Sequence, residues 1–353
     1  MAQAVDALRH GWPLEIDPGS GGTLILQPIE TAAVSDLQSD RLLISAARAA
    51  TLKLPNQREA AVPYAPVLIR GADGFTLSDA MAVADPALDL ARPMKGPFRA
   101  DPLEWAETAQ AVLELARIAG ILPAFMVAPA NAGEAQPFAP ADLEAWSDPA
   151  QLSIATRARL PIAATQEQDE PSEIVVFRKA DDMREHCALI IGKQMAGTTP
   201  LVRLHSECLT GDILGSLKCD CGPQLDAALH AMAQEADRGG YGVLLYMRQE
   251  GRGIGLVNKM RAYRLQDQGF DTVEANERLG LPDESRDFAT AARMLALLGI
   301  DRIRLMTNNP RKVTALEQEG INIAQRVAHQ LPDNPHNARY LATKRDRSGH
   351  LLE

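Results

Sequence analysis

Short apolar runs alternate with amphipathic stretches along the second half of the chain. Runs of four or five apolar residues are typical of buried strands, and apolar residues three or four positions apart are typical of helices. The expected strands are Ile174–Phe177, Ala188–Ile191, Val202–His205, Val243–Met247, Ile303–Met306 and Ile323–Val327. The expected helices are Pro223–Ala236, Ile254–Gln268, Asp287–Leu298 and Pro310–Glu319. This alternation predicts an α/β domain that binds its ligand at the strand ends.

The first half has a less regular pattern. Helical spacing predicts helices over Asp36–Leu52 and Asp101–Ala119, and short apolar runs predict strands at Pro66–Arg70 and Ile121–Val127. The stretch 163–172 is polar, lacks periodicity and ends in Pro-Ser, which is typical of a linker. We therefore predict two mixed α/β domains, residues 1–170 and 171–353, each with a mixed sheet and packed helices.

Composition narrows the classes of protein. No apolar run is long enough to span a membrane, and the N-terminus lacks the apolar stretch of a signal peptide, so a cytoplasmic location without membrane attachment is expected. The formal net charge is −10, and the excess acid lies in the first half. This balance gives no support to nucleic-acid binding.

Three of the four cysteines form a Cys-x10-Cys-x-Cys pattern, at Cys208, Cys219 and Cys221. Thiolates suit zinc, and a catalytic zinc site usually has three protein ligands and an open position for water. The alternative is a structural zinc site, for which Cys187 or His205 would be the fourth ligand. A further alternative is a set of buried thiols that bind no metal.

Two glycine- or amide-rich segments follow predicted strands and open predicted helices. They are Gln249–Gly255 and Thr307–Lys312. Backbone N–H groups at such turns favour an anion. Basic residues crowd the first segment, namely Arg248, Arg252, Lys259 and Arg261, although a solvated basic helix face would have the same composition. A third loop places Arg286 among Asp283, Glu284 and Asp287.

From Leu201 almost to the C-terminus, the chain resembles GTP cyclohydrolase II. The similar segments are RLHSECLTGDILGSLKCDCGPQLDAAL, LLYMRQEGRGIGLVNKMRAYRLQDQGFDTVEAN, MTNNPRKV and NPHNARYLATKRDRSGHLL. The resemblance implies one zinc ion per subunit on Cys208, Cys219 and Cys221, magnesium with the triphosphate, and a homodimer. It implies that GTP is converted into formate, pyrophosphate and a diaminopyrimidine ribotide, the first step of riboflavin biosynthesis.

The resemblance also assigns roles to individual residues. It implies that Arg286 attacks the α-phosphate, that Glu284 accepts a proton and that Tyr263 lies near the zinc. The residues implied to bind GTP are Arg203, Leu204, His205, Ser206, Glu207, Gln224, Glu250, Gly251, Arg252, Thr272, Thr307 and Lys312.

One departure from the family pattern keeps other functions open. The proton acceptor is usually an aspartate, whereas Glu284 stands there with Asp283 beside it. Reach decides acid–base function before pKa does. The alternatives are a cyclohydrolase acting on another purine nucleotide and a non-catalytic, zinc-stabilised nucleotide-binding regulator.

The N-terminal region faintly resembles 3,4-dihydroxy-2-butanone-4-phosphate synthase, in LLISAARAATLKLP and ETAQAVLELARIAGILPAFMV. The acidic metal-binding run of that family is missing between Leu24 and Leu42, and its Gly-His-Thr-Glu-Ala element is replaced by Asp101–Ala109. Without clustered carboxylates there is no obvious magnesium site. We therefore predict a degenerate domain without synthase activity.

Overall fold

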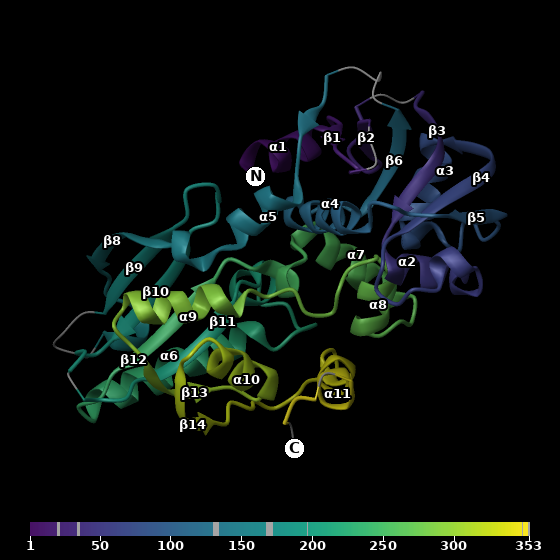
Figure 1. Ribbon diagram of the computed structural model, residues 1–353. Coiled ribbons are helices and arrows are strands. Elements are labelled where there is room, and N and C mark those ends of the chain that lie inside the picture. Colours follow the sequence, from purple (N-terminus) through teal and green to yellow (C-terminus); the bar gives the residue numbers. More distant parts are fainter. Residues whose placement is uncertain are drawn as a thin grey trace. The chain divides into compact units, whose positions relative to one another are not determined.

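The computed structural model describes residues 1–19, 22–33, 36–129, 134–166, 172–195, 197–347 and 349–351, except for the side chains of Pro129 and Arg339. The chain forms two compact units (Figure 1). Unit 1 contains Met1–Ser147 and Gly253–Ser285, and unit 2 contains Asp148–Arg252 and Arg286–Glu353. Each unit has a mixed sheet and packed helices, so the predicted fold class is confirmed.

Unit 1 is built on a seven-stranded sheet with the order β5-β4-β3-β6-β2-β1-β7. Its strands are β1 (Leu14–Ile16), β2 (Leu24–Pro28), β3 (Gln38–Ile44), β4 (Val67–Thr76), β5 (Phe98–Asp101), β6 (Ala124–Pro129) and β7 (Gln136–Pro137). Its helices are α1 (Ala2–His10), α2 (Ala46–Thr51), α3 (Leu77–Ala84), α4 (Ala106–Ala119), α5 (Pro140–Ser147), α7 (Leu256–Asp267) and α8 (Thr272–Arg278).

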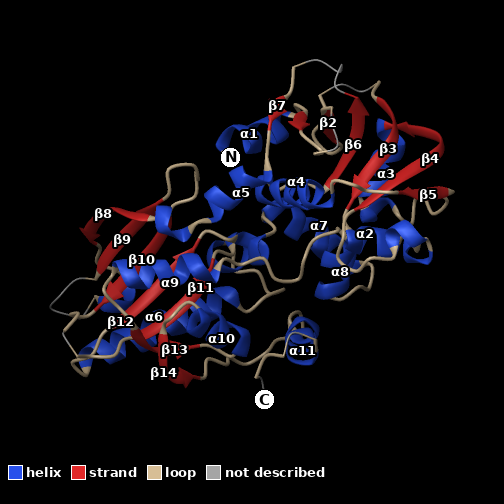
Figure 2. Cartoon of the chain, viewed as in Figure 1, coloured by secondary structure: helices blue, strands red, loops and turns tan. Residues whose placement is uncertain are grey.

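Helices cover both faces of the unit 1 sheet (Figure 2). Successive side chains of a strand point to opposite faces. Leu43 therefore packs against α1 and α4, whereas Leu42 and Ile44 pack with α2, α3, α7 and α8. Unit 1 thus has three layers, and its second face is completed by helices that come from beyond residue 252.

Unit 2 is built on a second seven-stranded sheet with the order β14-β13-β11-β12-β10-β9-β8. Its strands are β8 (Ser153–Arg159), β9 (Glu173–Arg178), β10 (His186–Ile191), β11 (Leu201–Ser206), β12 (Gly242–Met247), β13 (Arg302–Met306) and β14 (Asn322–Val327). Its helices are α6 (Cys221–Asp237), α9 (Phe288–Leu297), α10 (Pro310–Gln318) and α11 (Ala338–Asp346).

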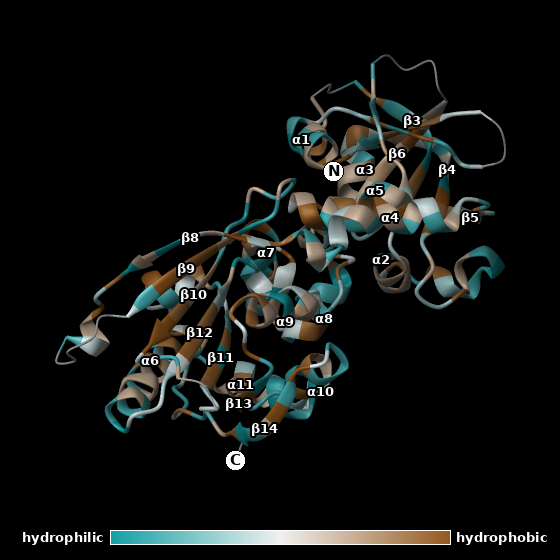
Figure 3. Cartoon of the chain, turned by 60° about the vertical axis from the view of Figure 1, so that its left-hand side comes forward, coloured by the Kyte–Doolittle hydropathy of each residue, from teal (hydrophilic) through white to brown (hydrophobic). Residues whose placement is uncertain are grey.

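The central strand β12 of unit 2 is apolar on both faces, and Figure 3 colours it largely brown. Val243 and Leu245 of β12 face α9 and α10, while Leu244 faces α6. Gly242 lets α6 approach the sheet, because a Cβ atom there would lie 2.4 Å from the Cβ of Met232. Within the described residues, no helix combines the length and the apolar character that crossing a bilayer needs.

All six strands expected in the second half form, and so do its four expected helices. The helix expected over Asp36–Leu52 is wrong, because this stretch forms β3 followed by α2. Ser45 separates the two elements, since its Oγ accepts a hydrogen bond from the Arg48 N–H and caps α2 (3.2 Å). The apolar residues at the end of β3 and the alanines of α2 together have helical spacing, so the two elements were predicted as one helix.

The predicted boundary between residues 170 and 171 lies outside the described residues. The compact units divide the chain elsewhere, after Ser147, and unit 1 takes in Gly253–Ser285. A linker pattern cannot reveal that a segment returns to an earlier unit, because the contacts that place it there join residues far apart in sequence. The synthase-like character of the N-terminal region stays a prediction.

His186 at the start of β10 gives the fold a pH dependence. Its side chain is buried, and its Nδ1 accepts a hydrogen bond from the Arg248 N–H (3.0 Å). Burial, and then the nearby Arg184, lower the pKa of His186 to about 4. The pKa of an unfolded histidine is about 6.5, so below that pH the unfolded chain binds a proton that the folded chain excludes.

We therefore expect the free energy of unfolding to fall as the pH drops from about 6.5 to 4, and His186 to account for about 2 kcal/mol of the change between pH 7 and 5. His186→Asn keeps an acceptor for Arg248 but does not titrate. Denaturant unfolding at both pH values should show a flatter dependence for this variant than for His10→Asn, which alters an exposed histidine. Equal slopes for the two variants would contradict the assignment.

Candidate active site and metal centre

Three parallel strands of unit 2 end at one edge of the sheet. β11 lies between β12 and β13 and is parallel to both. Glu207 and Cys208 follow β11, Arg248 to Arg252 follow β12, and Thr307 to Lys312 follow β13. The carboxyl edge of parallel strands is where α/β sheets usually bind ligands. The motifs singled out in the sequence therefore meet in one place.

The three clustered cysteines come together at this edge. The Sγ atoms of Cys208, Cys219 and Cys221 all lie within 4.8 Å of one another, and those of Cys208 and Cys219 are 3.7 Å apart. Two sulfur ligands of a tetrahedral zinc ion lie about 3.8 Å apart, given Zn–S bonds of about 2.3 Å. The separation of Cys208 and Cys219 therefore fits two ligands of a tetrahedral ion, and Cys221 lies close enough to be a third.

Neither proposed fourth ligand joins the thiols. Among the described residues, the group of potential metal ligands at this place has three members. Cys187 is half-buried in β10, opposite Tyr246. The His205 Nε2 lies 3.0 Å from Asp212 Oδ1. This geometry favours an open metal position over a closed four-ligand shell.

Asp212 organises the loop that carries Cys208, and the sequence analysis did not identify it. Its buried carboxylate accepts hydrogen bonds from the Cys208 N–H (3.0 Å) and the Tyr246 hydroxyl (2.9 Å), and it contacts His205. Such partners fix the orientation of metal ligands. An acidic residue four positions after a cysteine has no distinctive pattern, so the sequence offered no signal for it.

The electrostatics of the three thiols favour a bound cation. Contact with Cys208 and Cys219, followed by burial, raises the pKa of the Cys221 thiol well above its usual range. Three sulfurs this close resist ionising together unless a positive charge lies among them. The Gly211 N–H also points to Cys208 Sγ (3.3 Å).

Gly211 allows the backbone to pass between the thiols. A Cβ atom on Gly211 would lie 2.9 Å from Cys219 Sγ and 3.0 Å from Cys208 Sγ. We expect Gly211→Ala to lower the metal content of the purified protein to less than about a tenth, comparable to the loss caused by disturbing groups that orient ligands. Metal analysis of the variant after dialysis measures this.

Gly215→Ala is the matched control for Gly211→Ala. Gly215 has a φ of +63°, but an added Cβ would meet no atom of the described residues within 4 Å. The control therefore adds backbone strain without touching the thiols. If both variants kept their metal, or lost it equally, the steric explanation would be wrong.

Buried cations lie beside the three thiols. Arg203 in β11 donates to the Met306 carbonyl (3.2 Å) and to Gln224 Oε1. Its Nε is buried and has no hydrogen-bond partner among the described residues, a condition that it shares with the Nε atoms of Arg293 and Arg304. Burial lowers the pKa of Arg203 to about 10, so it stays charged at neutral pH. Lys312 in α10 is also buried, and its Nζ donates to the Leu204 carbonyl (2.9 Å).

Several basic side chains of unit 2 lie close to His350, near the C-terminus. Burial lowers the pKa of His350 to about 3. Four basic side chains from separate segments act in the same direction, Lys344, Arg252, Arg286 and Lys312. Converging positive charge of this kind is suited to a polyanion.

A network links the C-terminal helix to the cysteine loop. It contains Gln224, which the resemblance implied to bind GTP, and three residues that the sequence did not single out: Asp220, His329 and Lys344. The Lys344 Nζ of α11 donates to Asp220 Oδ1 (2.6 Å), and Asp220 lies between two of the cysteines. Gln224 Nε2 donates to Asp220 Oδ2 (2.7 Å), and the Gln224 carbonyl is 2.8 Å from His329 Nε2. A cavity of about 940 Å³ beside Asp220 and Gln224 is lined by residues of α11 and of the segment after β14.

The remaining predicted residues of unit 2 lie at the same strand ends. Ser206 ends β11, and Glu207 pairs with Arg248 (2.8 Å). The buried Thr307 accepts a hydrogen bond from the Asn309 N–H (3.0 Å).

The turn after β12 is strained. Glu250 Oε2 accepts from the Leu209 N–H (2.7 Å), which ties the turn to the cysteine loop. Gly251 and Arg252 are both left-handed, with φ of +64° and +61°. For an arginine this costs on the order of 1 kcal/mol, a strain often found at functional sites.

The structure divides the predicted catalytic residues between the units. Arg286 is the first residue of unit 2 after Ser285, whereas Tyr263, Thr272 and Glu284 belong to unit 1. Tyr263 lies in α7 with Lys259 Nζ 5.7 Å from its ring centroid, and the Thr272 hydroxyl accepts from Gln266 (3.0 Å). Arg261 pairs with Glu30, so it is part of unit 1 rather than of a solvated basic face. The roles of these residues stay predictions.

Comparison with known proteins identifies the family. The family model described as GTP cyclohydrolase II matches residues 157–328. A protein named GTP cyclohydrolase-2 from Azospirillum brasilense is 40% identical over 99% of this chain and 93% of its own. Another of that name from Hahella chejuensis is 57% identical over 50% of this chain and 83% of its own. A riboflavin biosynthesis protein RibBA from Salinispora arenicola is 45% identical over 69% of this chain and 61% of its own.

The match to the Azospirillum protein includes the N-terminal region as well as the three cysteines. The family model covers the cysteine cluster and the loops after β11, β12 and β13. With these matches and a site of this geometry, the chain belongs to the GTP cyclohydrolase II family of riboflavin biosynthesis enzymes.

Proposed function

We propose that this chain hydrolyses GTP in a zinc-dependent reaction, with formate, pyrophosphate and a diaminopyrimidine ribotide as products. The observation that carries the proposal is the set of three thiols, spaced for a tetrahedral ion, at the same sheet edge as buried cations. When bound, zinc supplies a Lewis acid that makes water an effective nucleophile at neutral pH.

The unsatisfied Arg203 Nε supports a bound anion. A buried guanidinium nitrogen without a partner is costly, and a phosphate oxygen would satisfy it. Lys312 and Arg252 add positive charge to the same region. In the proposed reaction these cations bind the triphosphate, which arrives with magnesium.

Arg286 has the role of nucleophile in this proposal. A guanidinium nitrogen of Arg286 forms a bond to the α-phosphorus while the bond to the pyrophosphate oxygen breaks, and Glu284 takes the proton that the nitrogen loses. Water then cleaves this P–N bond, which gives the free 5'-phosphate and returns the proton to Arg286. Glu284 lies two residues before Arg286 along the chain, so covalent connection keeps the two close. Tyr263 has the proposed role of a proton donor near the guanine ring.

The test is incubation of the zinc-loaded protein with Mg-GTP, with formate and pyrophosphate measured separately. We expect both products from GTP and much less from ATP or GMP. Equal turnover of ATP would favour a cyclohydrolase for another purine nucleotide. This alternative is open because Glu284 stands where the family usually has an aspartate. GTP binding without either product would favour a zinc-stabilised regulator.

A further inference from the structure

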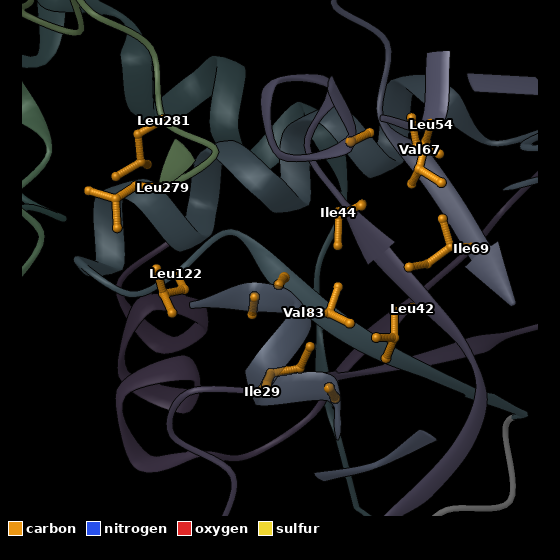
Figure 4. Packing of buried hydrophobic residues seen from close by; sticks show 14 of the residues in the cluster. Ile29, Leu42, Ile44, Leu54, Val67, Ile69, Val83, Leu122, Leu279 and Leu281 are labelled. Carbon is orange, nitrogen blue, oxygen red and sulfur yellow. The ribbon is translucent and has the colours of Figure 1, made fainter. Parts of the chain in front are cut away.

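The segment Gly253–Ser285 is part of the hydrophobic core of unit 1. Six of its residues are almost completely buried in one cluster with the N-terminal sheet: Ile254, Ala262, Leu265, Ala275, Leu279 and Leu281. Leu279 and Leu281 lie in the same cluster as Leu122 and Ile44 (Figure 4). This segment therefore relies on residues 1–147 to cover its apolar side.

Polar contacts fix the segment at specific points. Glu30, which follows β2, binds Arg261 of α7 through both guanidinium nitrogens (2.9 and 3.0 Å) and also accepts from the Leu122 N–H (2.7 Å). Both side chains of this pair are mostly buried. Arg261 in turn donates to Asn258 Oδ1 (2.9 Å), whose amide nitrogen donates to the Ile254 carbonyl (3.1 Å). Glu30 thus connects the N-terminal sheet to the first two turns of α7.

The second helix of the segment is held equally closely. Gly280, after α8, has a φ of +75°, and a Cβ there would lie 2.5 Å from Ser45 Oγ. Arg278 of α8 stacks on Phe270 (3.9 Å) and lies 3.8 Å from Asp89, which Arg48 binds through two hydrogen bonds. Packing this tight requires the two parts of unit 1 to fold together.

We propose that residues 1–147 act as an internal scaffold for the cyclohydrolase, holding the segment Gly253–Ser285 in its folded conformation. The segment carries Tyr263, Thr272 and Glu284, and its two ends join Arg252 and Arg286. The catalytic part of this inference rests on the proposed function, whereas the folding part does not. A domain without synthase chemistry of its own would thereby serve the reaction of its neighbour.

The experiment uses the full-length protein and the Glu30–Arg261 pair. Glu30→Ala is the main probe, since Glu30 lies outside every motif that resembles the GTP site. Hydrogen exchange followed by mass spectrometry reports on peptides within 253–285 and, as an internal reference, on peptides from β12. Zinc content and the KM and kcat for GTP are measured on the same samples.

We expect Glu30→Ala to speed exchange in 253–285 at least about tenfold, with β12 and the zinc content unchanged, and GTP turnover to fall at least about tenfold. Arg261→Ala should match it, and the double variant should be no worse than the worse single variant, because the pair acts as a unit. Arg70→Ala is the control, since it breaks an ion pair with Asp101 within β4 and β5 and should leave exchange in 253–285 and turnover as in the parent protein.

The scaffold proposal would be wrong if exchange in 253–285 stayed unchanged in Glu30→Ala. It would also be wrong if turnover fell only in proportion to a loss of zinc. If Glu30→Ala fails to fold, Glu30→Gln keeps an acceptor for Leu122 and should give a smaller change in the same direction; no change at all would again contradict the proposal. Failure of the proposed function is distinguishable, because it would appear as absent GTP turnover in the parent protein.

Discussion

Cys219→Ser should lose both its bound zinc and its GTP turnover, the latter by at least about a thousandfold. A Lewis acid contributes several kcal/mol to such a reaction, and each 1.4 kcal/mol is about tenfold in rate. Cys219 is buried and its Sγ lies within 4.8 Å of the other two thiols, so a serine hydroxyl would replace a strong ligand by a weak one. Metal analysis and formate release, measured on the same sample, give the two numbers.

Cys187→Ser is the matched control for this experiment. Cys187 is half-buried in β10 and does not belong to the three-thiol group. It should keep zinc and turnover within about twofold of the parent, as expected for a substitution away from the site. A Cys219→Ser protein that kept its turnover would show that the thiols are not the catalytic centre.

Arg286→Ala should have the second largest effect. We expect pyrophosphate release to fall at least about a thousandfold while the zinc content stays unchanged, because the side chain is proposed to act on the substrate and not on the metal. Arg286 is near enough to influence Arg203 and His350 electrostatically, which places it in the same cationic cluster. Formate and pyrophosphate assayed separately show which half of the reaction is lost.

Arg302→Ala controls for the loss of one positive charge, since Arg302 is exposed at the start of β13. It should behave like the parent protein. Normal pyrophosphate release by Arg286→Ala would show that Arg286 is not the nucleophile.

Strands and the strand-end motifs were the most predictable part of this protein. A run such as Val243–Met247 is buried on both faces of a central strand, so its apolar character alone indicates a strand. Because such strands are parallel, the motifs that follow them meet at one edge, which made the grouping of Cys208, Arg252 and Thr307 predictable.

Features that depend on contacts between distant residues were not predictable. Nothing in the sequence near Asp212 or Lys344 indicates that one orients the cysteine loop and the other pairs with Asp220. The return of Gly253–Ser285 to unit 1 likewise depends on side chains such as Leu122 and Glu30. A sequence pattern describes one side of such a contact, whereas the residues on the other side are known only from the three-dimensional structure.

The most direct test of the account is zinc-edge X-ray absorption on the purified, zinc-loaded protein. It should show three sulfurs at about 2.3 Å and one oxygen or nitrogen at about 2.0 Å, with that light atom replaced or displaced in the presence of GTP. Four sulfurs, a shell unaffected by GTP, or no bound zinc at all would contradict a metal centre built for catalysis.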